Sequence, residues 1–142
     1  MPYFTVAQLR EDQIGLTFPL ARLAGGAPDE KDWIAELADL RAKGGLIGLF
    51  ANDALFGFLS WYEENSVLKV AHFLTCEVSS AAPGRKRLCE AADALARARR
   101  CEAVEIRIQN RGYAQAESAK AKGWHQLGHS LDAVIFRKEL VA

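Results

Sequence analysis

Apolar positions along this chain recur with two spacings, every second residue in some segments and every third or fourth in others. The first spacing is typical of strands and the second of helices. The pattern predicts seven strands, at residues 3–9, 46–51, 54–62, 68–78, 103–108, 125–130 and 133–140. It predicts four helices, at residues 11–23, 30–43, 85–100 and 113–122. The predicted order is therefore β-α-α-β-β-β-α-β-α-β-β.

Several element ends carry their own signals. Asp29 is placed to cap the second helix, because a short side-chain oxygen there accepts hydrogen bonds from the first backbone amides, and Gly44-Gly45 ends that helix. Pro19 predicts a kink or a second start within the first helical segment, since proline lacks a backbone donor. Asn52-Asp53 lies between two apolar strands and predicts a two-residue hairpin turn.

The order of elements indicates the fold class. Antiparallel hairpins beside a strand–helix–strand unit favour one mixed, mostly antiparallel sheet with helices packed on it, an α/β (α+β) sandwich. A chain of 142 residues is long enough to bury a substantial core, and no internal repeat, low-complexity tract or linker interrupts it. We therefore expect a single domain over residues 1–142.

Charge and cysteine content exclude several function classes. The 18 basic and 18 acidic residues give a formal net charge of zero, which argues against a general role in binding nucleic acid or membrane surfaces. Cys76, Cys89 and Cys101 show no C-x-x-C spacing, so we expect no disulfide framework and no metal site. No apolar run is long enough for a signal peptide or a membrane span, and we expect a cytoplasmic protein.

The junction between the strand at 68–78 and the helix at 85–100 is the strongest candidate binding site. Free backbone N–H groups converge at a helix N-terminus, where the helix dipole also favours negative charge. The positive charges of Arg85, Lys86 and Arg87 interact unfavourably with this dipole unless a bound anion neutralises them. We expect an anion to bind over Ser79–Leu88, and the alternative is a solvated basic turn.

The order and lengths of these elements resemble the Gcn5-related N-acetyltransferase (GNAT) superfamily over nearly the whole chain. Residues 48–59, GLFANDALFGFL, are similar to the family's second and third strands, with Gly57 where many members have a glycine. Leu74-x-Cys76-x-Val78 is similar to the end of the fourth strand. Asn110 and Gly123-Trp124 resemble the asparagine and the Gly-Phe pair of the family's C-terminal half.

The resemblance implies acetyl-CoA as co-substrate, held where the fourth and fifth strands separate. Its pantetheine would pair with the fourth strand, and its pyrophosphate would rest on the turn that follows. The residues implied in binding are Cys76, Val78, Ser79, Gly84, Arg85, Lys86, Arg87, Leu88 and Asn110. The family signature Q/R-x-x-G-x-G/A is not intact, because one register places Pro83, Lys86 and Leu88 at its fixed positions and the other places Gly84, Arg87 and Cys89 there. Basic side chains would then supplement the backbone amides.

Few residues are candidates for acid or base catalysis. Glu77 and Glu105 lie where the resemblance implies that the strands separate, and either carboxylate could act as a base if burial raised its pKa. The alternative for Glu105 is pairing across strands with Arg107 or a lysine. The family's acid tyrosine would fall on Ala119, which leaves Tyr113 on the same predicted helix either as a substitute of poor geometry or as a partly buried structural residue.

Other polar and aromatic residues have both a functional and a structural interpretation. His72 lies in an apolar strand and is either a catalytic candidate or a hydrogen-bonded residue of the sheet. We expect Cys76 to be a small buried residue rather than a nucleophile, and Trp33 to belong to the core. The segment Trp61-Tyr62-Glu63-Glu64, an aromatic pair followed by two acids, could receive a cationic amine.

The resemblance implies an acyl-CoA-dependent N-acetyltransferase that passes an acetyl group directly to a primary amine of a small molecule or peptide. The altered signature and the missing tyrosine leave an alternative, a non-catalytic binding module of the same fold. An unrelated α/β domain with the same element order is a third interpretation, since fold does not fix function. The apolar strand at 133–140 could pair across a homodimer or lie within the core.

Overall fold

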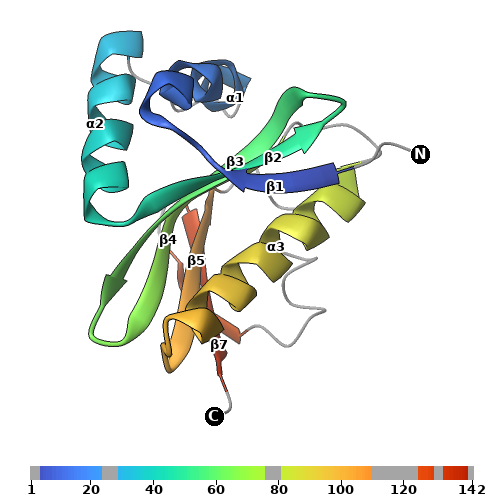
Figure 1. Cartoon of the computed structure of the whole chain (residues 1–142). Coiled ribbons are helices and arrows are strands. Elements are labelled where there is room, and N and C mark those ends of the chain that lie inside the picture. Colours follow the sequence, from blue (N-terminus) through green and yellow to red (C-terminus); the bar gives the residue numbers. More distant parts are fainter. Residues whose placement is uncertain (1–3, 24–28, 76–80, 110–124, 130–132, 141–142) are drawn as a thin grey trace.

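The computed structural model describes residues 4–23, 29–75, 81–109, 125–129 and 133–140 (Figure 1). Its strands are β1 (Phe4–Gln8), β2 (Gly45–Ala51), β3 (Ala54–Glu64), β4 (Val67–Thr75), β5 (Ala103–Gln109), β6 (His125–His129) and β7 (Ala133–Glu139). Its helices are the 3₁₀-helix η1 (Glu11–Thr17), α1 (Phe18–Leu23), α2 (Glu30–Lys43) and α3 (Ala81–Ala98). The predicted order is confirmed for these elements, and the helix predicted at 113–122 lies outside the described residues.

The helix predicted at 11–23 is divided into two. Glu11–Thr17 forms a 3₁₀-helix, and α1 begins at Phe18 with Pro19 as its second residue. Proline is tolerated in the first turn of a helix, where its missing N–H has no acceptor within the helix. The second start predicted from Pro19 is confirmed.

Both ends of α2 follow from local chemistry. Asp29 Oδ1 accepts hydrogen bonds from the backbone N–H groups of Lys31 at 2.7 Å and Asp32 at 3.3 Å, so the predicted cap is confirmed. At the other end, a Cβ on Gly44 would lie 2.0 Å from the carbonyl oxygen of Trp61. The close approach of β3 therefore requires glycine where α2 ends.

The strands form one sheet in the order β1-β2-β3-β4-β5-β7-β6. All neighbouring pairs are antiparallel except β4 and β5, which are parallel and are connected through α3. The turn between β2 and β3 holds Asn52 and Asp53 at φ values of 52° and 68°, a left-handed conformation that Asn and Asp adopt more readily than most residues. The predicted hairpin and the mixed, mostly antiparallel sheet are confirmed.

The last strand in sequence is not the last strand in the sheet. β7 (Ala133–Glu139) lies between β5 and β6, with a neighbour along each edge. The structure therefore supports the core interpretation of this strand, and β7 offers no edge for pairing with a second copy.

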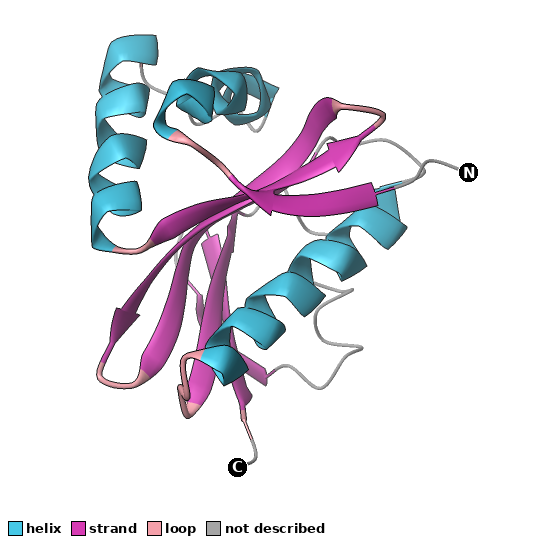
Figure 2. Cartoon of the chain, in the orientation of Figure 1, coloured by secondary structure: helices cyan, strands magenta, loops and turns pink. Residues whose placement is uncertain are grey.

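Helices cover both faces of the sheet (Figures 1 and 2), α3 on one face and η1, α1 and α2 on the other. We call these the α3 face and the α2 face. On the α3 face, Leu88 and Ala92 are fully buried against the strands. On the α2 face, Trp33 is buried against Phe58, and its indole N–H donates to Thr17 Oγ1 at 2.8 Å. The expected core position of Trp33 is confirmed.

The start of α3 differs from the prediction. The helix begins at Ala81 and not at about Arg85, so part of the expected loop is helical. Pro83 fits the first turn because no hydrogen-bond acceptor is available to its position there. A Cβ on the buried Gly84 would lie only 3.0–3.2 Å from side-chain atoms of Leu49, Phe4 and Phe56. Glycine thus lets α3 pack closely on the sheet.

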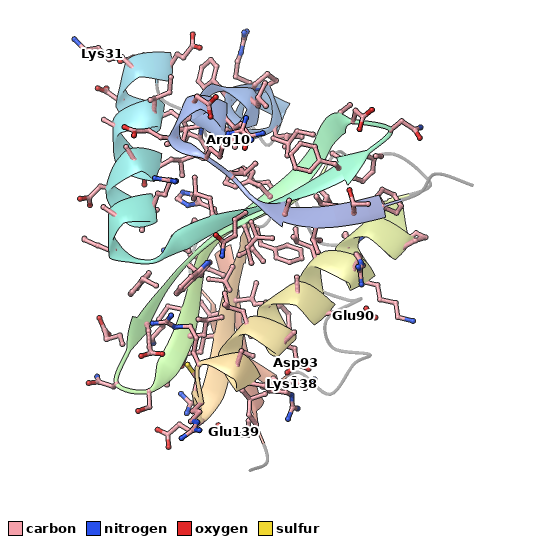
Figure 3. The ribbon with its side chains drawn as sticks, in the orientation of Figure 1. Arg10, Lys31, Glu90, Asp93, Lys138 and Glu139 are labelled. Atoms are coloured by element: carbon pink, nitrogen blue, oxygen red, sulfur yellow. The ribbon has the colours of Figure 1, made fainter. Side chains whose placement is uncertain are left out.

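Charged side chains connect α3 to β7. Asp93 accepts hydrogen bonds from Lys138 Nζ and from Arg97 Nε, each at 2.8 Å; Asp93 and Lys138 lie next to each other in Figure 3. Burial alone would raise the pKa of Asp93, but these hydrogen bonds and charges outweigh burial and lower it.

No helix in the described part of the chain is long and apolar enough to cross a membrane.

Candidate functional site

β4 and β5 are paired over only part of their length, and this opening is the centre of the candidate site. Their parallel ladder joins Val67–Val70 to Ala103–Ile106. β4 continues to Thr75 and β5 to Gln109 without further pairing to each other among the described residues. A ligand that carries amide groups can therefore pair with β4 beyond Val70. The strand separation implied by the resemblance is observed.

Two buried polar atoms lie at the end of β4 and near the start of α3. Thr75 is the last residue of β4 and Arg85 lies near the start of α3. Among the described residues, neither Thr75 Oγ1 nor Arg85 Nε has a hydrogen-bond partner. A buried polar group without a partner costs about 1–3 kcal/mol. Lys86 and Arg87 are exposed next to Arg85 on the helix. This arrangement fits a ligand that brings negative charge and hydrogen-bond acceptors to the start of α3.

A pocket of about 940 Å³ opens on the α2 face. A pocket of this size accommodates a small molecule or the end of a peptide. Its ionisable lining residues are Glu36, Asp39 and Lys43 of α2, Tyr62 and Glu64 of β3, Lys69 and His72 of β4, and Glu105 and Arg107 of β5. Because His72 lies just beyond the end of the β4–β5 ladder, the pocket meets the opening between the strands at this residue.

A bulge in β4 directs His72 into the pocket. Ser60 of β3 pairs with His72 and Trp61 pairs with Val70, so Ala71 has no partner on β3. Val70 packs in the core of the α3 face, and strict alternation would send residue 72 to that face as well. The extra residue reverses the alternation, and His72 lines the pocket on the α2 face.

The His72 ring is held from several sides. Its Nδ1 lies 2.8 Å from Ser60 Oγ, which also accepts the backbone N–H of His72 at 3.0 Å. The ring packs edge-on against Trp33 and stacks on Phe58, at centroid distances of 5.1 and 6.2 Å. Its Nε2 lies 3.8 Å from Glu36 Oε1. His72 is thus a hydrogen-bonded residue of the sheet, and its second nitrogen is directed toward Glu36.

The surroundings of His72 favour its neutral form. Burial lowers its pKa from the ordinary value of 6.5, because desolvation disfavours the charged ring. The charge of Glu36 opposes this shift, and that of Arg107 adds to it. At neutral pH the ring is therefore uncharged, with one nitrogen able to accept a proton.

Glu105 is held by two cationic side chains. Lys69 Nζ donates to its Oε1 and Arg137 Nη1 to its Oε2, both at 2.7 Å. Burial alone would raise the pKa of Glu105, but these hydrogen bonds and charges outweigh burial and lower it. Glu105 also pairs with Lys69 in the closed part of the ladder. Its expected place at the strand separation is wrong, its pKa moves away from that of a base, and the alternative of cross-strand pairing with a lysine is confirmed.

Five of the residues predicted to bind the co-substrate lie on α3 itself: Gly84, Arg85, Lys86, Arg87 and Leu88. Packing on the sheet accounts for Gly84 and for the fully buried Leu88. Arg85 is half-buried, and contact between the three basic residues and a ligand stays a prediction. The other predicted site residues, Cys76, Glu77, Val78, Ser79, Asn110 and Tyr113, lie outside the described residues.

The segment Trp61–Glu64 does not form one cation site, because strand alternation divides it between the two faces. Trp61 belongs to the core of the α3 face, and the Arg99 guanidinium lies over its ring at 4.9 Å from the centroid. Arg99 Nε also lies 3.4 Å from Glu63. Tyr62 and Glu64 line the pocket on the other face. The prediction that all four residues receive one amine is wrong, and only Tyr62 and Glu64 face the pocket.

Ser60 and Glu36 contribute to the site without having been predicted from the sequence. Each meets His72 through a contact distant along the chain, Ser60 across the β3–β4 ladder and Glu36 from α2. Ser60 carried a usable signal, since a lone hydroxyl in the apolar run FGFLSW needs a partner when it is buried. Glu36 lies among other charged residues of its helix, and no sequence signal distinguishes it from them.

Comparison with known proteins identifies the fold. Neither a protein-family model nor a curated protein matches the chain. The PaiA N-acetyltransferase of Thermoplasma acidophilum in complex with coenzyme A matches with a TM-score of 0.74 at 15% identity, over 97% of this chain and 99% of that one. Ard1 of Thermoplasma volcanium matches with a TM-score of 0.81 at 12% identity, over 98% of this chain and 99% of that one. The ribosomal-protein-S18-alanine N-acetyltransferase of Escherichia coli matches with a TM-score of 0.78 at 12% identity, over 99% of this chain and 96% of that one. The chain has the GNAT fold, as the resemblance predicted.

Proposed function

We propose that this protein is an acyl-CoA-dependent N-acetyltransferase that transfers an acetyl group from acetyl-CoA to a primary amine of a small molecule or peptide. The observation that carries the proposal is the opening between β4 and β5, in a fold that the chain shares with solved N-acetyltransferases. One of those structures is a complex with coenzyme A.

Groups on both sides of the opening suit coenzyme A. The backbone of β4 beyond Val70 offers donors and acceptors to the amides of the pantetheine arm. Arg85, Lys86 and Arg87 bring positive charge to the start of α3, where the pyrophosphate would bind. In this proposal, basic side chains replace the glycine-rich backbone contacts of the family signature. Among the described residues, no group of three or more His, Cys, Asp and Glu side chains is placed to hold a metal ion.

The acceptor amine would bind in the pocket on the α2 face. Glu36 and Glu64 line it and attract a cationic amine, and Tyr62 adds an aromatic surface. In the transfer, the amine nitrogen attacks the thioester carbonyl carbon, the C–N bond forms, and the C–S bond breaks with its electron pair on sulfur. Holding the two reactants in contact supplies a large part of the rate.

Binding of acetyl-CoA is tested by thermal denaturation, with adenosine diphosphate as the control ligand. A ligand at about 100 times its Kd adds about 2.7 kcal/mol to the free energy of unfolding, which raises the Tm of a domain of this size by about 5–10 °C. We expect acetyl-CoA to raise the Tm well beyond the control. An equal shift with both ligands, or none at millimolar concentration, contradicts the proposal and favours the non-catalytic binding module.

The phosphate contacts are tested with a matched pair of variants. We expect the double substitution Arg85→Ala, Arg87→Ala to weaken acetyl-CoA binding about 10-fold or more, because each lost charge-assisted hydrogen bond contributes about 1 kcal/mol or more. The control, Arg97→Ala with Arg100→Ala, removes the same charge from the last turn of α3 and the turn that follows it, and should leave the affinity unchanged. Equal effects of the two pairs would contradict the proposed site.

A further inference from the structure

We propose that His72 is the general base of the transfer and takes a proton from the acceptor amine, with Ser60 and Glu36 positioning its ring. This inference rests on the proposed function and adds the group that activates the acceptor. Of the two glutamates predicted from the sequence as bases, Glu105 is occupied by two cations and Glu77 lies outside the described residues.

His72 lies where the two halves of the proposed site meet. The β4–β5 ladder ends at Val70, and His72 is the second residue beyond it. The bulge at Ala71 turns the imidazole to the α2 face, where it lines the pocket. A thioester held along the open edge of β4 and an amine in the pocket would come together at this side chain. Bulges near active sites often re-aim a side chain in this way.

The contact with Ser60 allows the ring to hold a proton on either nitrogen. A hydroxyl donates or accepts, so Ser60 Oγ, 2.8 Å from Nδ1, can accept an Nδ1–H while Nε2 carries the lone pair. Protonation at Nε2 then produces an imidazolium that faces Glu36 Oε1, 3.8 Å away. The side chain of Glu36 is 52% exposed, so this carboxylate stabilises the imidazolium without trapping the proton.

The charges around the ring suit a base that works near neutral pH. Burial lowers the pKa of His72, Glu36 partly restores it, and Arg107 lowers it further. The other ionisable side chains that line the pocket are Asp39, Lys43, Tyr62, Glu64, Lys69 and Glu105. Two oppositely charged pairs among them, Asp39–Lys43 and Lys69–Glu105, neutralise each other. Burial therefore sets the direction of the shift in the pKa of His72, and Glu36 and Arg107 are the charges that modify it.

The proposed step conserves atoms and charge. His72 Nε2 takes one proton from the ammonium form of the acceptor, which leaves the free amine and an imidazolium. The amine nitrogen bonds to the carbonyl carbon, and coenzyme A leaves with the electron pair of the C–S bond. The nitrogen then gives a second proton to that thiolate through solvent, which yields the amide and the thiol. The imidazolium returns its proton to water.

The test compares the pH profiles of four proteins. Release of the coenzyme A thiol is measured with a panel of primary amines, and kcat/KM for the best amine is recorded from about pH 6 to about pH 9. The proteins are the wild type, His72→Gln, Glu36→Gln and Glu30→Gln. Glu30 lies at the start of α2 and does not line the pocket, so its variant removes the same charge from the same helix as a control.

We expect His72→Gln to lower kcat/KM about 100- to 10,000-fold near neutral pH and to remove the limb of the profile that reports the base. Its deficit should shrink at alkaline pH, where the amine is already free. Glu36→Gln should move that limb to lower pH, because Glu36 raises the pKa of His72. Glu30→Gln should leave the profile unchanged.

A second measurement needs no variant. The pKa of the His72 ring, followed by NMR in the wild-type protein, should match the pKa of the kinetic limb. Three results would each overturn the role of His72 while the proposed function stands. They are transfer with an unchanged limb in His72→Gln, loss of acetyl-CoA binding in that variant, and a difference of more than about one unit between the two pKa values. Binding of acetyl-CoA without transfer to any amine would overturn both.

Discussion

Glu105 and His72 line the same pocket, and the structure holds them in opposite ways. Glu105 lies in the closed part of the β4–β5 ladder, with both oxygens bound to cations, Lys69 and Arg137. His72 lies beyond the ladder, with one nitrogen on the hydroxyl of Ser60 and the other directed toward a half-exposed carboxylate. Paired charge keeps Glu105 ionised, whereas desolvation keeps His72 neutral.

This difference shows how the position along one strand decides a role. Where β4 and β5 are paired, side chains from adjacent strands are close enough to satisfy a buried charge completely, as Arg137 of β7 and Lys69 of β4 do for Glu105. Beyond Val70, β5 no longer pairs with β4, and the side chain of His72 there lines the pocket. We infer that the closed end stabilises the fold and that the open end performs the chemistry.

The largest effect on stability should come from the closed end. Glu105→Gln leaves Lys69 and Arg137 without their shared carboxylate, and breaking such an ion pair costs about 3 kcal/mol of unfolding free energy. The measurement is equilibrium denaturation in urea. The control, Glu102→Gln, changes an exposed glutamate close by in the chain and should stay within about 0.5 kcal/mol of the wild type. A loss below about 1 kcal/mol for Glu105→Gln would remove the contrast between the two ends.

Acid should abolish the contribution of Glu105. Its folded-state pKa is lowered from the ordinary 4.5, so the stability that it contributes is fully present above that value and is lost as the pH falls through the folded pKa. Denaturation at a series of pH values should show the wild type and Glu105→Gln converging below about pH 4.5. A gap that stays constant into strong acid would show that the ion pairs are not its source.

His72 should affect stability at a higher pH. Its folded-state pKa is lowered from 6.5, so its contribution is complete above 6.5 and declines as the pH falls through the folded value. The wild type should therefore lose up to about 1.4 kcal/mol per pH unit relative to His72→Gln over that window. Parallel stability curves for the two proteins between pH 7 and the acid side of 6.5 would contradict the burial of a neutral ring.

The smallest effect on stability should come from the cap of α2. This helix carries Glu36, which faces His72, but no residue that pairs with Glu105. Asp29→Ala removes two hydrogen bonds to backbone amides and should lower the unfolding free energy by about 1 kcal/mol, measured as a fall in Tm of about 2–4 °C. Asp29→Asn keeps a capping oxygen and should stay within a few tenths of a kcal/mol of the wild type. If both variants lost the same stability, the side-chain cap would not be the cause.

Local chemistry made part of this structure predictable. Asp29 as a cap, Pro19 as a second helix start and the Asn52-Asp53 turn depend on neighbours in sequence, and all are found. The start of α3 was missed because Pro83 and Gly84 are typical of loops, whereas here one fits a first helical turn and the other a close contact with the sheet.

The arrangement of the candidate site was less accessible from sequence. The insertion of β7 between β5 and β6 brings Arg137 to Glu105, and no local pattern announces that order. The unpaired Ala71 decides which face His72 occupies, and this depends on the register between β3 and β4. Because catalytic assignments depend on such long-range pairing, Glu105 looked as suitable as His72 until the strands were placed.

The measurement that tests the central claim most directly is amide hydrogen exchange along β4, residue by residue, with and without acetyl-CoA. Ligand binding to the open edge should slow exchange within Ala71–Thr75 by a larger factor than within Val67–Val70, where the ladder to β5 already exists. Unchanged rates, or slowing by the same factor in both segments, would contradict the account, because the opening between β4 and β5 would then not be where acetyl-CoA binds.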